Sequence, residues 1–471
     1  MSGRTWLVIR AVMAVVLMVG FYVLAIGTAG LLLLFAYAQV VYLKLRVVKL
    51  VIVCVAGAAA ILWSLIPRRD KFIAPGPQVD PASEPALFDM LKGVATATDQ
   101  SMPTEVYVIA DVNAWVAQRG GVMGIGTRRI MGLGLPLLQS VTVPELKAIL
   151  AHEFGHYHAG DVALGPWIYR TRAAMERTIR QLSNSALRVI FLAYGRLFLR
   201  VTHAVSRRQE YIADELAARV VGAAPMTSAL RKVHATTPAF SAYWQSEVMP
   251  VLSSGFVPPI MSGFAQFVQV KAIAEDLQKH VNATEAESAT DPYDTHPSLK
   301  DRIAALGALP QGPRGDDRPA TTLLSSVDKW EQQLLSSLFG AEQFQTLKPV
   351  DWAAVVDRVY LPAWRKLVAD NAKIVNGLTI GSLPLSREML IGRGRGDLEG
   401  DGRITHAKYV IATSVALLLV DAGWRAETAP GEKLVLRGGD TRSVLFEEIN
   451  AFAGGERTSL DLGLPAALPL S

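Results

Sequence analysis

Apolar residues are concentrated at the start of the chain. Positions 11 to 43 give 33 residues without a formal charge, which would extend about 50 Å as one helix. A hydrocarbon layer is roughly 30 Å thick, so this stretch is too long for a single upright span. The cluster 27–30, Gly-Thr-Ala-Gly, is consistent with a tight turn between two short spans or with a kink in one tilted helix.

A second apolar stretch, Leu50 to Ile66, contains 17 uncharged residues and is followed by Arg68, Arg69 and Lys71. This length and this basic flank are typical of a spanning helix. A cleavable signal peptide is not expected, because the apolar region is far longer than the hydrophobic region of a signal peptide and a second apolar stretch follows it. Residues 1–70 are therefore predicted to be a transmembrane anchor of two or three spans. If there are two spans, the basic flanks favour a cytosolic location for the rest of the chain. If there are three, the rest of the chain is expected on the other side of the membrane.

The remaining pattern is that of globular protein. After a linker at 75–85, we predict a helix over Leu87–Thr98 and a strand over Glu105–Ile109. The glycine-rich segment 122–135 predicts one or two strands. Their bare backbone either accepts the close approach of another chain, such as a substrate strand, or forms a hairpin without that role.

Beyond a second linker at 311–321, the pattern predicts a C-terminal α+β accessory region, residues 320–471. Its expected elements are helices at 326–339, 352–369, 406–422 and 443–453, with a strand pair at 424–428 and 433–437. The helix at 406–422 is predicted to be buried, because its apolar centre is short for a span. The turn at 397–402 begins like a calcium loop, but Lys408 occupies the position that requires a bidentate glutamate, so calcium binding is rejected.

The amino-acid composition limits the functions and the metal ligands that are expected. Apolar residues make up 51% and charged residues 19%, which places part of the chain in lipid. The net charge of +5 comes without a run of five basic residues, so no nucleic-acid partner is expected. The single cysteine, Cys54, can form no internal disulfide. A metal site in this chain would therefore use His, Asp and Glu.

The strongest chemical pattern is His-Glu-Phe-Gly-His at 152–156. The capping box that starts at Thr142 predicts a helix from Val143 to about Ala159. Residues four apart share a helix face, so His152 and His156 can bind a single ion.

Glu153 flanks that face and can take a proton from an attacking water. Two imidazoles and one carboxylate suit zinc and leave a position open. The alternative is a surface helix with coincidental histidines.

A zinc site of this kind needs a third ligand from another element. The predicted helix Val201–Val221 offers Glu210 and Asp214, one turn apart, so one carboxylate can bind the metal while the other orients an imidazole. His203, two turns before Glu210, is the rival on spacing. His158 is expected to point away from the ligand face.

Four motifs in order resemble the integral-membrane zinc peptidases that include HtpX and the CAAX-prenyl endopeptidases, over about half of the chain. They are Asn113-Ala114-Trp115, then 151–156 with Gly160-Asp161, then Ser206-Arg207 with 210–214, and last His296-Pro297 with Arg302-Ile303.

The resemblance implies a zinc endopeptidase region, residues 75–310, that is mainly α with a small β-sheet, in a zincin-like α+β fold. It implies one Zn²⁺ per chain, with Glu210 as third ligand and Asp214 behind it. It also implies that Asn113 helps to hold the substrate backbone and that His296 stabilises the oxyanion. From the residues alone, His296 can equally cap a helix, and Arg302 is a second candidate donor or an internal ion-pair partner.

One segment departs from the family. HtpX-like proteins have two further spans between the histidine motif and the glutamate, whereas here residues 167–205 contain seven arginines, which ordinary spanning helices exclude. We expect 187–201 either to lie on the bilayer surface or to pack inside the domain.

The predicted protein is thus an integral membrane metallopeptidase of a bacterial-type plasma membrane. Its expected partners are lipid and polypeptide substrates, membrane-associated or misfolded, and the oligomeric state is open. The rival prediction is a catalytically silent membrane scaffold or adaptor whose zinc is structural or absent.

Overall fold

The computed structural model describes residues 3–42, 48–66, 72–119, 128–156, 165–182, 186–286, 296–312, 316–395, 398–439 and 442–470. The chain divides into two compact units: Met1–Ala235 with Lys279–Val327, and Thr236–Gln278 with Asp328–Ser471. The segment 236–278, which the sequence analysis assigned to the peptidase region, therefore groups with the C-terminal residues.

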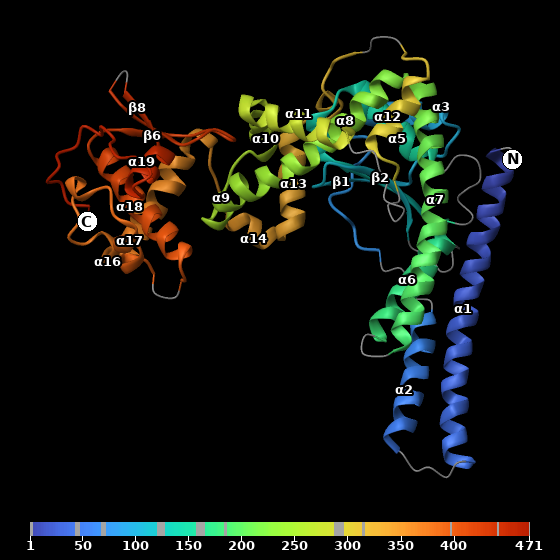
Figure 1. Cartoon of the computed structure of the whole chain (residues 1–471). Coiled ribbons are helices and arrows are strands. Elements are labelled where there is room, and N and C mark those ends of the chain that lie inside the picture. The colour runs from blue at the N-terminus through green and yellow to red at the C-terminus, as the bar shows by residue number, and fades with distance from the viewer. Residues whose placement is uncertain are drawn as a thin grey trace. The chain divides into compact units, whose positions relative to one another are not determined.

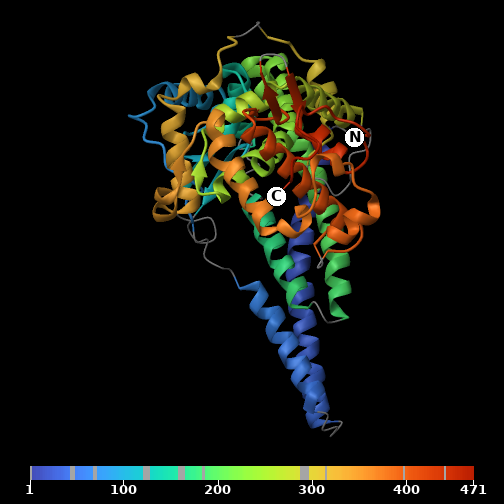
Figure 2. The same ribbon diagram turned by 90° about the vertical axis from the view of Figure 1, so that its left-hand side faces the viewer.

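The apolar N-terminus forms two long helices, α1 (Gly3–Val41) and α2 (Val48–Leu65). The first stretch is thus one continuous helix and not two short ones. The two helices lie side by side in both views (Figures 1 and 2). Small residues fill their contact, including Ala25, Ala29 and Ala58, while valine, leucine and phenylalanine side chains face outward. Outward apolar faces on long helices are expected where the solvent is lipid.

Two further helices, α6 (Gly165–Gln181) and α7 (Leu187–Val221), pack against this pair. The Phe21 and Phe191 rings meet edge to face, with centroids 6.3 Å apart. The Tyr194 hydroxyl donates to the Leu17 carbonyl at 2.7 Å. As the packing alternative for 187–201 predicted, one face of α7 packs against α1, while Val189, Ile190 and Leu197 on the same helix are exposed. By length and composition, α1, α2, α7 and a helix of the second unit, α18 (Asp401–Asp421), are each long and apolar enough to cross a membrane.

A three-stranded sheet has the order β1-β3-β2, with β1 at Glu105–Ile109, β3 at Arg128–Gly134 and β2 at Ala114–Arg119. Strand β3 pairs in parallel with β1 and antiparallel with β2. Part of the glycine-rich segment is thus strand, and 120–127 lies outside the described residues.

A Cβ on Gly132 would lie 2.4 Å from the Trp115 ring, so the bare backbone there accepts a side chain of the neighbouring strand. At this position the glycine has an internal packing role.

Four helices complete the first unit around the sheet: α3 (Pro85–Ala97), α4 (Leu135–Ser140), α5 (Val143–Gly155) and α12 (Leu299–Gly307). The predicted capping box is present at the start of α5, where Thr142 and Glu145 satisfy each other's backbone. The helix ends at Gly155, earlier than the predicted Ala159. Residues 157–164, which include His158 and Gly160, lie outside the described residues.

The second unit is also mainly helical. The link from the first unit runs through α8 (Ala223–Tyr243), and α11 (Lys271–Ala286) leads back to it. Its core is built around α18 (Asp401–Asp421), whose Val410, Ile411 and Val415 are fully buried, as predicted for this helix. Its other α-helices are α9 (Met249–Ser253), α10 (Ile260–Gln269), α13 (Val327–Phe339), α14 (Ala341–Thr346), α15 (Leu361–Asp370), α16 (Ala372–Val375), α17 (Arg387–Arg393) and α19 (Phe446–Ala453).

The strands of this unit form two small sheets. The predicted pair is β6 (Arg425–Glu427) with β7 (Val435–Gly438), and β8 (Arg442–Leu445) adds a third strand where the sequence predicted the start of a helix. Two short strands, β4 (Phe256–Val257) and β5 (Lys348–Pro349), pair in parallel. The predicted helix at 352–369 is divided into a 3₁₀ turn, a π-helical turn and α15.

Candidate metal centre

Helix α5 is anchored at its first turn by a buried carboxylate. Glu145 accepts a hydrogen bond from the Thr142 backbone at 2.7 Å, one from the Ser228 hydroxyl at 2.6 Å and one from the Lys232 ammonium at 2.8 Å. Because Ser228 and Lys232 belong to α8, these bonds fix the helix that carries the histidines against a second helix. Charge-assisted bonds of this kind are among the stronger ones in proteins.

The motif glycine lets α5 and α7 touch. A Cβ on Gly155 would lie 2.9 Å from the Cα of Ala213, a distance that real side chains do not adopt. The two backbones therefore meet between the histidines of one helix and the acids of the other. This contact places Glu210 opposite His152 and His156.

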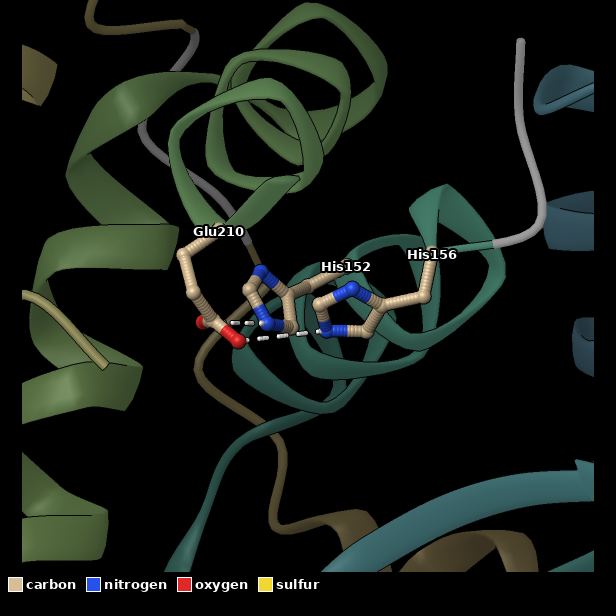
Figure 3. A group of neighbouring side chains, drawn as sticks. All are labelled: His152, His156 and Glu210. Atoms are coloured by element: carbon tan, nitrogen blue, oxygen red, sulfur yellow. Dashed lines mark ion pairs between the residues drawn. The ribbon is translucent and has the colours of Figure 1, made fainter. Parts of the chain in front are cut away.

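Three candidate ligands converge at this contact (Figure 3). His152 Nε2 lies 3.4 Å from Glu210 Oε2, and His156 Nε2 lies 3.6 Å from Glu210 Oε1. One ligand atom from each of the three residues lies within 4.8 Å of the others. His203, the rival on spacing, is buried on α7 but does not belong to this group. The helices thus bring together the three residues that the sequence and the resemblance indicated.

The donor set fits a zinc ion. Glu210 Oε2 is buried and forms no hydrogen bond within the described residues, although His152 Nε2 and Arg302 Nη1 lie 3.4 and 3.5 Å from it. Two imidazole nitrogens and a carboxylate oxygen are the ligands of many catalytic zinc sites. The 3.4 and 3.6 Å spacings from Glu210 are close to the roughly 3.4 Å expected between two ligands that each lie about 2 Å from a tetrahedral zinc ion.

Behind His152 lies a second acidic residue. His152 Nδ1 is 2.9 Å from Asp214 Oδ1, so Asp214 lies on the side of the ring away from Glu210. Arg302 of α12 holds Asp214 through two bonds, Nε to Oδ2 at 2.8 Å and Nη2 to Oδ1 at 2.6 Å. Asp214 thus lies where it can orient the imidazole, and Arg302 fixes Asp214 in turn.

The two candidate oxyanion donors lie on different sides of Glu210. His296 Nδ1 is 3.0 Å from Glu210 Oε1, and its side chain is 58% exposed. Arg302 Nη1 is 3.5 Å from Glu210 Oε2, but the side chain is only 8% exposed and is bound to Asp214. Of the two side chains, His296 is the more exposed.

The edge strand β2 lies next to Glu153. The Val116 backbone amide donates to the Glu153 carboxylate, which ties the candidate base to this strand. Asn113 precedes β2 and is exposed, and its carbonyl accepts from the Gly134 amide at 2.8 Å. Asn113 therefore stands at the start of the strand that borders the site.

Burial and neighbouring charges shift the pKa values of the α5 side chains. Burial raises the pKa of Glu153 to about 7, with a further contribution from the Glu210 carboxylate. Desolvation lowers the pKa of His156 to about 4, so the ring is neutral, as a metal ligand must be.

Burial alone would lower the pKa of His152. The contacts with Asp214 and Glu210 outweigh it and raise the value to about 9. The two carboxylates therefore favour a positive charge at this point, which a divalent cation also supplies.

Sequence reasoning missed three features of this site. These are the contact of Gly155 with Ala213, the paired hydrogen bonds from Arg302 to Asp214, and the bond from the Val116 amide to Glu153. Each joins segments that are distant along the chain. Gly155 and Arg302 were visible as motif residues, but nothing local shows what they touch.

Comparison with known proteins agrees with this geometry. Residues 81–309 match the model of peptidase family M48. The chain is 26% identical over 201 residues to Protease HtpX of Acinetobacter baylyi, which covers 38% of this chain and 58% of that protein. It is 26% identical over 250 residues to Protease HtpX of Chromohalobacter salexigens, covering 48% of this chain and 72% of that protein. No solved structure matches the chain. Residues 81–309 are therefore a peptidase M48 region similar to Protease HtpX.

Proposed function

We propose that this chain is a membrane-anchored zinc endopeptidase that binds one Zn²⁺ through His152, His156 and Glu210. The observation that carries the proposal is the convergence of these three side chains from two helices, with Glu153 beside them. A structural zinc site would usually have four protein ligands, whereas this group has three. The match to peptidase family M48 supports the same conclusion.

Zinc bound here would polarise the carbonyl of a peptide bond and make a nearby water more acidic. Glu153 takes the proton of the attacking water and passes it to the leaving amine. A pKa near 7 suits this exchange, because the group can both accept and return a proton. His296, exposed beside Glu210, donates to the oxygen on which negative charge develops.

The substrate lies along β2 as an added strand, with Asn113 holding its backbone at one end. Within the described residues, β2 is paired only with β3, so no third strand occupies its other edge, where the Val116 amide donates to Glu153. Because α1 and α2 hold the site near a bilayer, the substrates are unfolded or membrane-associated polypeptides. The catalytic region faces the cytosol of a bacterial-type plasma membrane, and the second unit, residues 236–278 with 328–471, is an accessory domain.

The test compares wild type with Glu153→Gln and Glu210→Gln, purified in detergent, for casein cleavage and zinc content. Glu153→Gln should keep its zinc and lose at least about a hundredfold in turnover, because the proton acceptor is gone. Glu210→Gln should lose both zinc and activity.

The matched control is Glu215→Gln, on the same helix but exposed and paired with Arg219. This variant should behave as wild type. Equal turnover by Glu153→Gln and wild type would remove Glu153 from the mechanism. Zinc-loaded wild type without turnover on any polypeptide tested would favour the scaffold instead.

A further inference from the structure

The segment between the two ligand helices is unusually basic. Residues 165–209 contain nine arginines, one glutamate and neither lysine nor aspartate, a net charge of +8. The whole chain carries +5, so everything outside this segment sums to −3. The positive charge of the protein is thus concentrated on α6 and on the part of α7 that precedes Glu210.

This helical hairpin lies at the end of a membrane helix. The Ser64 hydroxyl is 2.6 Å from the Thr178 hydroxyl, and the Arg177 guanidinium donates to the Ser64 carbonyl at 3.1 Å. Ser64 is in the last turn of α2, whose 18 residues extend about 27 Å, close to the thickness of a hydrocarbon layer. Beyond Thr178, α6 continues for only three residues, about 5 Å of helix. The end of the hairpin therefore lies at the boundary between acyl chains and headgroups.

The outward face of α7 is both apolar and basic. Val189, Arg196, Leu197 and Arg200 follow a helical spacing and are all exposed, which puts them on one side of the helix. Arg180 and Arg188 are exposed as well. In the part of the chain that the structure describes, Arg180, Arg188, Arg196 and Arg200 form no ion pair with an acidic side chain. Exposed valine and leucine between unpaired arginines are unsuited to water alone and equally unsuited to the bilayer centre.

We propose that the α6–α7 hairpin binds the phosphate headgroups of anionic phospholipids at the membrane surface. Guanidinium groups bind phosphate through two parallel hydrogen bonds, and the basic residues of this segment are all arginine. The exposed apolar side chains enter the acyl region beside them, continuing the lipid-facing surface of α1 and α2. A nucleic acid would meet the same charges but would leave the apolar side chains in water.

The test measures lipid selectivity and needs no peptidase assay. Full-length protein in mild detergent is incubated with equimolar phosphatidylglycerol and phosphatidylcholine of identical acyl chains, and retained lipids are counted by intact-complex mass spectrometry. Wild type should retain several times more phosphatidylglycerol. Combined substitution of Arg180, Arg188, Arg196 and Arg200 by glutamine should abolish that preference, so that the two lipids are retained about equally, since each arginine near an anionic surface contributes.

The matched control replaces four exposed arginines of the second unit, Arg358, Arg365, Arg425 and Arg437, by glutamine and should keep the preference. Replacing Arg180, Arg188, Arg196 and Arg200 by lysine keeps the positive charge but removes the guanidinium group that forms two parallel hydrogen bonds. The lipid preference of this variant should be intermediate. If the combined glutamine variant does not fold, Arg196→Gln and Arg200→Gln measured singly should each lower the preference.

Three results would overturn the proposal: wild type without preference, a hairpin variant that keeps it, or an equal loss in the control. Retention of an oligonucleotide in place of phosphatidylglycerol would also overturn it.

Discussion

Replacing Arg302 by methionine keeps a long side chain at this position but removes the charge that holds Asp214. Arg302 is 7% exposed and Asp214 2%, and two bonds of 2.8 and 2.6 Å join them. Removing one partner of a buried ion pair costs about 3–5 kcal/mol, because the other charge stays buried without compensation. Arg302 interacts electrostatically with three acidic side chains, Glu153, Glu210 and Asp214, and all three lose this positive neighbour in the variant.

For a unit of this size, each kcal/mol shifts the melting temperature by about 2–4 °C. We therefore expect Arg302→Met to lower the melting temperature of the zinc-free protein in detergent by on the order of 10 °C. Bound zinc should reduce the deficit, because the ion places positive charge beside the same carboxylates. Circular dichroism of wild type and variant, each with chelator and with zinc, measures both differences.

Two further variants make the result specific. Lys300 is on the same helix, α12, but is exposed. Lys300→Met removes an equal charge and should have the same melting temperature as wild type. Arg302→Lys keeps the charge but cannot form the paired hydrogen bonds of the guanidinium group. Its melting temperature should therefore lie between those of wild type and Arg302→Met. If Arg302→Met melts with wild type, the pair does not hold α12 to α7 and the reasoning about this site fails.

Three other outcomes are expected. Asp214→Asn should weaken zinc binding by about 10–100-fold, measured by competition with a chromogenic chelator, because the orienting partner of His152 is altered. Glu145→Ala should lower the unfolding free energy by about 2 kcal/mol near neutral pH. Burial would raise the pKa of Glu145, but hydrogen bonds from Lys232 and Ser228 outweigh it and lower the pKa below 4.5, so its contribution is present above pH 4.5 and lost as the pH falls through the folded value. Thermal unfolding from neutral pH to pH 3 should show this component in wild type and not in the variant. Chelation should lower the melting temperature of wild type but not of Glu210→Ala, since a ligand present at 100 times its Kd stabilises by about 2.7 kcal/mol.

Features that depend on neighbouring residues were predictable from the sequence. The strand at Glu105–Ile109 has its predicted bounds, and the start of α5 follows from the Thr142 capping box. The convergence of His152 and His156 follows from helix geometry alone, because residues four apart share a face. The choice of Glu210 came from the family resemblance, since spacing on the same helix also allowed His203.

Features that depend on tertiary contacts were not predictable. Glycines at 27 and 30 allow a turn, yet α1 continues through them, and its buried Ala25 and Ala29 belong to the core that it shares with α2, α6 and α7. The glycine-rich strand suggested room for a substrate, whereas Gly132 is filled by Trp115. In both places a glycine permits several conformations, and the partner that selects one lies elsewhere in the sequence.

Helix α7 connects the membrane anchor to the candidate metal centre. One continuous helix carries Phe191, packed among α1 and α2, and Glu210, which completes the candidate metal centre. The two residues are 19 positions apart, about 29 Å along the helix. An uninterrupted helix transmits displacement over this length, since bending it requires breaking backbone hydrogen bonds. Helix α7 therefore connects the membrane helices to the candidate metal centre through one continuous element, and a displacement of the anchor would be felt at Glu210.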